Sequence, residues 1–309
     1  MLNWVVAGIG DIATRRVIPA ILAEPRSRLY GVVTRGVAKG ARYGGKVWTD
    51  FDGALQDAAV DAVYIAMPVA LHAPLTVAAL GAGKHVLCEK PMALDCAAAG
   101  RMVAAAREAG RLLGIGYYRR LYPKVRRAAE LLAAGAIGRP VMAFATTHNW
   151  FNAEGGHRGW LLDPALAGGG PLYDTACHRI DLFNLLFGRP AAVTAQLSNV
   201  VFPGEVEDAA TVLVDYESGV RGIVDARRHS RVVRDEFRIV GTDGEIEMSP
   251  LNGPSLVYPG GAEELPAHEN LHYPLVENFA SAVLEGAPLA SSGETALATD
   301  WVIAQAVSR

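Results

Sequence analysis

The sequence predicts an α/β domain with a doubly wound parallel sheet over residues 1–118, followed by an α+β domain with an open-faced, mostly antiparallel β-sheet over residues 119–309. Three observations predict this division. A glycine-rich turn follows the first apolar run, strand-like and helical patterns alternate as far as Tyr118, and later apolar runs are joined by very short turns. Alternating strands and helices are typical of parallel sheets, whereas closely spaced strands with two-residue turns are typical of antiparallel hairpins.

Composition narrows the class of protein. The 309 residues are 51% hydrophobic with a net charge of -3, so the chain can bury a large core but has no basic excess for a nucleic-acid or membrane-surface partner. The three cysteines, Cys88, Cys96 and Cys177, lack metal-ligand spacing, so we expect no metal and free thiols in a reducing compartment. Because no apolar run reaches about 18 residues and no signal peptide is visible, we expect a cytoplasmic protein without a membrane span.

The first predicted strand ends in a glycine-rich turn. Residues 4–7 are apolar, as expected of a strand buried on both faces of a parallel sheet, and a G-x-G-x-x-A pattern followed by a helical pattern comes next. Gly8 would make the tight turn, Gly10 would admit a pyrophosphate, and Ala13 would let strand and helix pack closely. This context predicts a dinucleotide site, whose contacts in the turn would be Gly8, Gly10, Asp11, Ile12 and Ala13.

The end of the second predicted strand, residues 29–34, indicates which dinucleotide binds. An NAD site usually has an acid about 20 residues beyond the glycines, which binds the ribose 2′-hydroxyl. This chain has Thr34 and Arg35 there and no acid before Asp50. Because a hydroxyl and a guanidinium suit a 2′-phosphate, the sequence favours NADP(H), with NAD as the alternative.

Two later predicted strands end in polar motifs. The strand over residues 60–67 leads to Pro68, and the strand over 85–88 leads to Glu89 and Lys90. Open α/β sheets bind ligands at the carboxyl ends of their strands, where an ammonium could stabilise charge on a substrate oxygen. Glu89–Lys90 could equally be a surface pair. Further predicted cofactor contacts are Ala66, Met67, Pro68, His72, Glu89 and Lys90, with His72 interpreted as pocket structure.

After Tyr118 the pattern becomes that of an antiparallel sheet. The predicted strands span residues 141–147, 193–201, 211–216, 220–226, 237–241 and 245–248, after a helix over 123–134. We expect Val212, Val214 and Tyr216 to leave apolar area exposed on an open face. The sequence thus predicts a homodimer or homotetramer paired through these sheets, with the last helix free to pack back on the first domain.

The segment from Gly168 to Asp181 combines three glycines with an acid and an imidazole. If the residues after Pro171 are helical, Asp174, His178 and Asp181 fall at i, i+4 and i+7, on one face of the helix. Glycines before a helix let the backbone approach a ligand closely. The alternative is a capped helix with a surface Asp–His pair.

These motifs together resemble a known family. The N-terminal glycine turn, the Pro68-to-His72 motif, the Glu-Lys-Pro motif and the Asp–His helix follow one another as in the glucose–fructose oxidoreductase, inositol dehydrogenase and rhizopine-catabolism (Gfo/Idh/MocA) family. The resemblance implies a Rossmann domain and NAD(P)-dependent oxidation or reduction of a sugar or related polyol. It matches Lys90, Asp174 and His178 to that family's catalytic residues. The chain departs from the usual pattern at Val69, Leu161 and Ala176.

The resemblance implies a mechanism in which His178 exchanges a proton with the reacting hydroxyl, Lys90 holds the same oxygen, and Asp174 orients the substrate or the imidazole. The sequence offers further candidate pocket residues, namely Tyr117, Tyr118, Arg119, Arg120, His148, Trp150 and Trp160. Two alternatives remain: a non-catalytic NADP-binding regulatory protein, and an NAD-dependent glycoside hydrolase of the same family.

Overall fold

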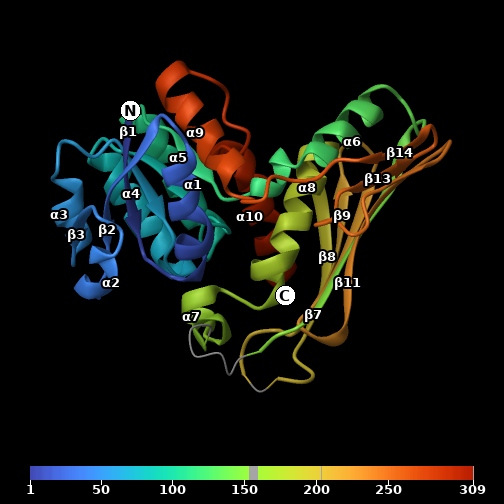
Figure 1. Ribbon diagram of the computed structural model, residues 1–309. Helices are drawn as coiled ribbons and strands as arrows, with labels where there is room; N and C mark the ends of the chain where they lie inside the picture. The colour runs from blue at the N-terminus through green and yellow to red at the C-terminus, as the bar shows by residue number, and fades with distance from the viewer. Residues whose placement is uncertain (153–158, 203, 309) are drawn as a thin grey trace. The chain divides into compact units, whose positions relative to one another are not determined.

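The chain folds into two compact units in the computed structural model, which describes residues 1–152, 159–202 and 204–308 (Figure 1). The first unit comprises residues 1–118 and 268–297, and the second comprises residues 119–267 and the chain from 298 onward. The sequence had placed residues 268–297 in the second domain. They belong to the first unit because Phe279 packs on Trp4, with ring centroids 5.2 Å apart.

The first unit contains a six-stranded parallel sheet in the order β3-β2-β1-β4-β5-β6. The central strand is buried on both faces, because Trp4, Val5 and Val6 are fully inaccessible. The prediction of a doubly wound parallel sheet is confirmed. The strands are β1 (Leu2–Ala7), β2 (Ser27–Val33), β3 (Lys46–Trp48), β4 (Ala62–Ile65), β5 (His85–Cys88) and β6 (Leu113–Ile115).

Two helices of this unit, α3 (Phe51–Leu55) and α5 (Cys96–Ala109), begin at an aspartate that caps the first turn. Asp50 and Asp95 each accept a hydrogen bond from a backbone nitrogen three residues later, and Gly110 ends one helix in the left-handed conformation. The helical segments are η1 (Ala13–Val17), α1 (Ile18–Ala23), α2 (Val37–Ala41), α3 (Phe51–Leu55), η2 (Val69–Leu71), α4 (His72–Gly81), α5 (Cys96–Ala109) and α9 (Tyr273–Glu285). Residues 293–297 of α10 (Gly293–Val307) also belong here.

The second unit contains an eight-stranded sheet in the order β14-β13-β12-β11-β7-β10-β9-β8, in which β7 and β10 pair in parallel and the other named pairs are antiparallel. The mostly antiparallel sheet is therefore confirmed. Its strands are β7 (Pro140–Trp150), β8 (Pro190–Ser198), β9 (Ala209–Tyr216), β10 (Arg221–Arg227), β11 (His229–Gly241), β12 (Glu245–Glu247), β13 (Ser255–Tyr258) and β14 (Gly261–Glu264). Its helical segments are η3 (Tyr118–Leu121, from Arg119), α6 (Pro123–Ala133), η4 (Gly159–Leu162), α7 (Pro164–Ala167), η5 (Leu172–Ala176), α8 (Cys177–Phe187) and the rest of α10.

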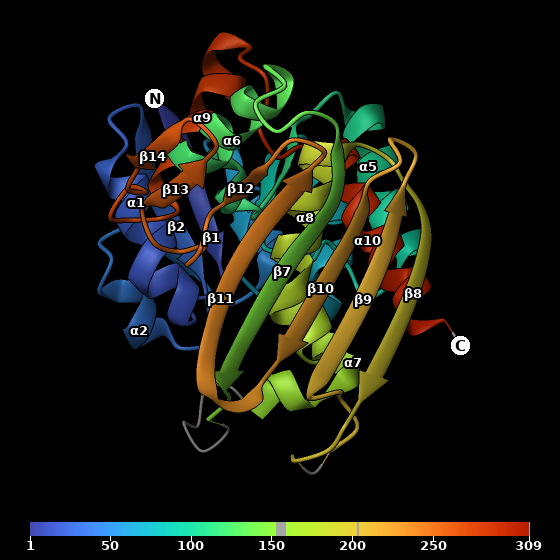
Figure 2. The ribbon, with the colours of Figure 1, turned by 90° about the vertical axis from the view of Figure 1, so that its right-hand side faces the viewer.

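Helix α8 covers one face of this sheet, and Figure 2 looks onto the opposite face. Phe183 of α8 packs on Phe237 of β11, with ring centroids 5.2 Å apart. The expectation that Val212, Val214 and Tyr216 lie exposed is wrong, because all three are buried. Alternate residues of a strand point to opposite faces of the sheet. The uncovered face therefore carries the half-buried residues of β7, β9 and β10, among them Phe144, Thr146, Leu213, Ile223 and Asp225.

Across residues 1–152, 159–202 and 204–308, no helix combines the length and the apolar character that crossing a membrane requires.

Candidate functional site

The glycine turn after β1 has the backbone geometry that the motif predicts. Gly8 has φ +88°, and a Cβ on it would lie 2.6 Å from the carbonyl oxygen of Ala66 and 2.7 Å from Sδ of Met67. A Cβ on Gly10 would meet nothing within 4 Å. Gly8 is therefore required by the close approach of the end of β4, whereas Gly10 faces open space. The turn fits a pyrophosphate, which needs exposed backbone N–H groups and no obstructing side chain.

The residues that follow the glycines differ in how far they are buried. Ala13 is fully buried, as close packing of strand and helix requires. Asp11 and Ile12 lie exposed, and Asp11 pairs with Arg15 at 3.1 Å. The segment from Ala13 to Val17 is π-helical rather than α-helical. Such widened turns are frequent at functional sites.

A cation that the sequence pattern does not single out lies at the glycine turn. Lys39 of α2 donates a hydrogen bond from Nζ to the carbonyl oxygen of Ile9 at 2.5 Å. Thr34 at the end of β2 accepts from the backbone nitrogen of Gly36 at 3.2 Å, and Arg35 is exposed. Lys39 belongs to no recognisable motif in the sequence, because its link to the turn depends on how α2 follows β2.

His72 ties together the ends of two neighbouring strands. Its Nδ1 lies 2.8 Å from the carbonyl oxygen of Pro91, and its Nε2 lies 2.8 Å from that of Met67. Burial lowers the pKa of His72, against the opposing effect of these two contacts. His72 thus connects the segment after β4 to the segment after β5, beside the Glu-Lys-Pro motif.

The carboxylate of Glu89 is buried in the first unit. Its Oε1 accepts hydrogen bonds from the hydroxyl of Tyr64 at 2.8 Å and from Nε2 of His272 at 3.1 Å. Burial raises the pKa of Glu89, but the hydrogen bond and charge of His272, the charge of Lys90 and the Tyr64 hydroxyl lower it to about 2. Glu89 is therefore no surface pair with Lys90. No sequence signal near residue 89 could have indicated His272, which is 183 residues away.

In the second unit, Asp174 and His178 occupy one helical segment that changes character between them. Residues 172–176 form a π-helical turn, and α8 begins at Cys177. Asp174 is half-buried in the π-helical turn, and His178 is 4% exposed in α8. The predicted helix is therefore present, but its first turn is wider than the α-helical spacing assumed. Asp181 is buried farther along α8, where it pairs with Arg120.

The three glycines before this helix make room for the chain itself. A Cβ on Gly170 would lie 1.8 Å from the carbonyl oxygen of Glu207, and Cβ atoms on Gly168 and Gly169 would meet the ring of Tyr173. The carboxylate of Glu207 accepts from the backbone nitrogens of Gly170 at 2.8 Å and of Leu172 at 3.0 Å. Burial raises the pKa of Glu207, against these two hydrogen bonds. The close approach that these glycines permit is thus to Tyr173 and Glu207.

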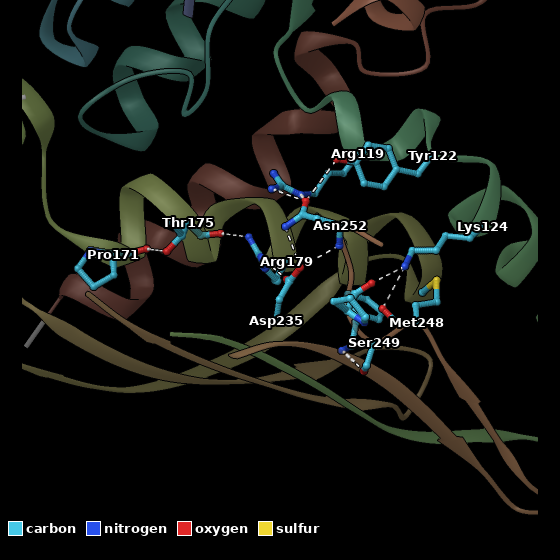
Figure 3. Close-up of polar contacts among 12 residues, drawn as sticks. Arg119, Tyr122, Lys124, Pro171, Thr175, Arg179, Asp235, Met248, Ser249 and Asn252 are labelled. Atoms are coloured by element: carbon cyan, nitrogen blue, oxygen red, sulfur yellow. Dashed lines mark hydrogen bonds and ion pairs between the residues drawn. The ribbon is translucent and has the colours of Figure 1, made fainter. Parts of the chain in front are cut away.

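A polar network fixes the start of α8 to the sheet (Figure 3). Arg179 donates to Asp235 at 2.7 Å and to the carbonyl oxygen of Thr175 at 3.2 Å. Asp235 accepts from the backbone and side-chain nitrogens of Asn252, both at 2.8 Å, and Asn252 accepts from Arg119 at 3.0 Å. The residue after His178, Arg179, therefore anchors the start of α8 to β11.

The remaining pocket candidates lie in different places. His148 points to the uncovered face of the sheet, where its Nε2 lies 2.7 Å from Asp225, so the structure does not bring it beside α8. Trp150 is exposed and contacts Phe202, with ring centroids 5.1 Å apart. Trp160 is partly buried against a cluster of Phe151, Leu161 and Ala167. Tyr117 and Tyr118 are buried in the first unit.

Family models match both parts of the chain. Residues 2–117 match the model described as "Oxidoreductase family, NAD-binding Rossmann fold", and residues 125–247 match "GFO/IDH/MocA C-terminal domain".

Individual relatives match over almost the whole length. 1,5-anhydro-D-fructose reductase from Ensifer adhaerens is 32% identical over 324 residues, covering 100% of this chain and 97% of that protein. The crystal structure of aldose-aldose oxidoreductase from Caulobacter crescentus complexed with glycerol matches with a TM-score of 0.87 at 29% identity, covering 98% and 97% of the two chains. That of GenD2 from gentamicin A biosynthesis in complex with NAD matches with a TM-score of 0.86 at 28% identity, covering 99% and 93%.

The glycine turn, the Glu-Lys-Pro motif and the Asp–His helix thus occur in a chain that matches both domain models. The chain belongs to the Gfo/Idh/MocA family of NAD(P)-dependent oxidoreductases.

Proposed function

We propose that this protein reduces a carbonyl group, or oxidises a hydroxyl group, of a sugar, polyol or related compound with NADP(H) as its cofactor. The observation that carries the proposal is the joint presence of Lys90, Asp174 and His178 in a chain whose relatives include an anhydro-sugar reductase and an aldose-aldose oxidoreductase. A protein that only bound the nucleotide would have no use for all three.

The cofactor would be held by the first unit. The exposed backbone at Gly10 suits the pyrophosphate, and the ends of β4 and β5 bear the residues expected near the nicotinamide, including Met67, Pro68 and Lys90. When bound there, the nicotinamide would supply the hydride chemistry. We propose NADP(H) rather than NAD(H) because Thr34 and Arg35 provide a hydroxyl and a positive charge just after β2, and Lys39 of α2 adds a positive charge at the glycine turn.

The proton chemistry would be carried by side chains. In reduction, His178 donates a proton to the substrate oxygen, and in oxidation it accepts the hydroxyl proton; an imidazole suits both because it titrates near neutrality. Lys90 donates a hydrogen bond to the same oxygen and stabilises its negative charge. Asp174 orients the substrate or the imidazole.

We also propose that the protein is a homodimer or homotetramer paired through the uncovered face of its C-terminal sheet. That face presents apolar side chains such as Phe144, Leu213 and Ile223 among charged ones such as Asp225 and Arg227, all of them half-buried. A two-fold pairing of this face would bury the apolar residues, while Asp225 and Arg227 already pair with each other at 2.9 Å. A monomeric mass by light scattering at micromolar concentration would contradict it. The three thiols suit a cytoplasmic location, which stays our expectation.

The function is tested by a substrate screen. Aldoses, polyols, osones and anhydro-sugars are incubated with NADPH or NADP⁺, and the absorbance of the reduced nicotinamide is followed. We expect at least one of these classes to be turned over, with activity that depends on His178. Tight NADPH binding by calorimetry without turnover of any class would instead point to a regulatory protein.

A further inference from the structure

The strongest unexplained feature of the first unit is a buried carboxylate directly before Lys90. Glu89 is 9% exposed, and its two main donors, Tyr64 and His272, are 0% and 1% exposed. One carboxylate oxygen, Oε1, receives both donors, while Oε2 lies 3.3 Å from the backbone nitrogen of Lys90. A buried charge is costly unless it is paired, so this arrangement requires a reason.

His272 is held in place from several sides. Asn270 accepts from the backbone nitrogen of His272 at 3.0 Å and donates to the carbonyl oxygen of Arg16 at 2.8 Å. The ring of Tyr118 packs on the imidazole, with centroids 4.8 Å apart. Helix α9 starts at the next residue, Tyr273. The imidazole is thus fixed with Nε2 directed at Glu89, and because the carboxylate can only accept, Nε2 carries the hydrogen.

The charged and titratable groups around Glu89 favour its ionised form. His272 and Tyr64 donate to it, and the charge of Lys90 also lowers its pKa. His72 responds to the charge of Glu89, and Tyr118 lies near Tyr64. Glu89 directly precedes Lys90, and its Oε2 lies 3.3 Å from the backbone nitrogen of Lys90, so the two charged residues are close neighbours. Charge coupling between two groups is reciprocal, so a carboxylate that is stabilised by Lys90 stabilises the ammonium form of Lys90 in return.

We propose that His272 and Tyr64 are positioning residues that hold the Glu89 carboxylate in place, and that this carboxylate extends to higher pH the range in which Lys90 is protonated for its contact with the substrate oxygen. The proposal rests on the role of Lys90 given under Proposed function. A neutral amine at residue 90 could still donate a hydrogen bond but would not offset developing negative charge. Glu89 is therefore the electrostatic partner of Lys90, and His272 acts through Glu89.

The first test measures the protonation of Lys90 without any substrate. Acetic anhydride modifies only the neutral amine, so the extent of Lys90 acetylation across the alkaline pH range, read by peptide mass spectrometry, gives a midpoint. In Glu89→Gln the midpoint should fall by about one pH unit, because the stabilising charge is gone. Glu108→Gln is the matched control, since it removes an exposed carboxylate of the same unit, and it should leave the midpoint unchanged. Equal midpoints in the parent and Glu89→Gln would overturn the proposal.

The second test concerns His272 and follows protonation of Glu89 itself. The infrared band of a protonated carboxyl that is missing in Glu89→Gln reports this group. In His272→Phe the band should appear at a higher pH than in the parent, because the donor that lowers the pKa of Glu89 is removed. His272→Gln keeps an N–H donor, so in this variant the band should appear at nearly the same pH as in the parent. Should His272→Phe fail to fold, Tyr64→Phe removes one donor to the same oxygen and should shift the band in the same direction.

These measurements separate the proposal from the function on which it rests. If the titration of the Glu89 carboxyl is unchanged in His272→Phe or Tyr64→Phe, these residues only pack against Glu89, even in an active enzyme. Conversely, the parent protein could turn over no substrate while its variants still show the Lys90 and Glu89 shifts. That result would argue against the substrate role of Lys90 but support its electrostatic link to Glu89. In an active enzyme, Glu89→Gln should lower kcat at alkaline pH more than at neutral pH, with KM for the cofactor nearly unchanged.

Discussion

Arg120 and Asp181 form a buried, two-point ion pair, in which Nε of Arg120 lies 2.8 Å from Oδ2 of Asp181 and the second amino group bonds the other oxygen. Thr299 of α10 also donates to Asp181, at 3.2 Å. Burial raises the pKa of Asp181 even though Arg120 and Thr299 oppose this. The pair joins η3 to α8, three residues after His178. Arg120 is a candidate pocket residue in the sequence, and the structure pairs its guanidinium with Asp181.

Asp181→Asn should lower the free energy of unfolding by about 3–5 kcal/mol, because it leaves the buried guanidinium of Arg120 without a counter-charge. Urea unfolding followed by circular dichroism measures this. Asp215→Asn is the matched control, since Asp215 pairs with Arg221 at 2.6 Å but both side chains are largely exposed. That variant should cost less than about 1 kcal/mol. Similar losses in the two variants would contradict a special role for the buried pair.

Gly170→Ala should destabilise the protein by about 3 kcal/mol, the upper end of the usual overpacking cost, since its Cβ would overlap the Glu207 carbonyl and force the backbone apart. Activity should fall with it, because the displaced segment carries Asp174. Gly100→Ala in α5 is the comparison, because a Cβ there meets nothing within 4 Å. Alanine at residue 100 should be neutral or stabilise the helix by up to about 1 kcal/mol. Thermal unfolding midpoints of the two variants test this contrast.

Arg35→Asp should abolish or reverse the preference for NADP(H), because it places a carboxylate against the 2′-phosphate. Lys39→Met should weaken NADPH binding by a smaller factor and leave NADH binding nearly unchanged. Calorimetric dissociation constants for NADPH and NADH in the three proteins measure these effects. Equal binding of both nucleotides by the parent would sink the NADP(H) proposal.

Lys90→Ala and His178→Ala should each lower kcat by roughly 10²–10⁴-fold, the usual range for removing a proton-transfer or charge-stabilising group. Asp174→Asn should have an intermediate effect, because an amide still orients but no longer carries charge. The double variant of Lys90 and His178 should lose much less than the product of the single losses, since both act on one oxygen. Nucleotide affinity should change little. Turnover within threefold of the parent in either single variant would assign the Asp–His helix a structural role.

Stability should fall in acid through protonation of Glu89. The pKa of Glu89 in the folded protein, about 2, lies below the 4.5 of an unperturbed glutamate, so its contribution to stability is complete above pH 4.5 and is lost as the pH falls through about 2. The pKa difference corresponds to roughly 3 kcal/mol. Unfolding free energies measured across this window should therefore slope more steeply in the parent than in Glu89→Gln. Parallel slopes would show that other carboxylates cause the acid sensitivity.

Local sequence was sufficient for the fold class and for the motifs. The turn at Gly8 and Gly10 could be recognised because a strand, a tight turn and a helix each have a short-range signature. The antiparallel second sheet followed from turn residues and alternation. In the same way, the Asp–His helix and the Glu-Lys-Pro segment are contiguous, so their positions along the chain were predictable.

Alternation along β9 showed that Val212 and Val214 share a face, but not which face α8 would cover, because both faces of a strand have the same period. The partners of Glu89, Asp181 and Gly170 likewise could not be read locally. His272, Arg120 and Glu207 reach them from distant segments, and no periodic pattern encodes such contacts. The sequence by itself determined the types of element and their chemical motifs, since these depend on neighbours in the chain. Only the tertiary structure decided which buried charges are paired and which glycines receive another segment, because those depend on packing between elements far apart in sequence.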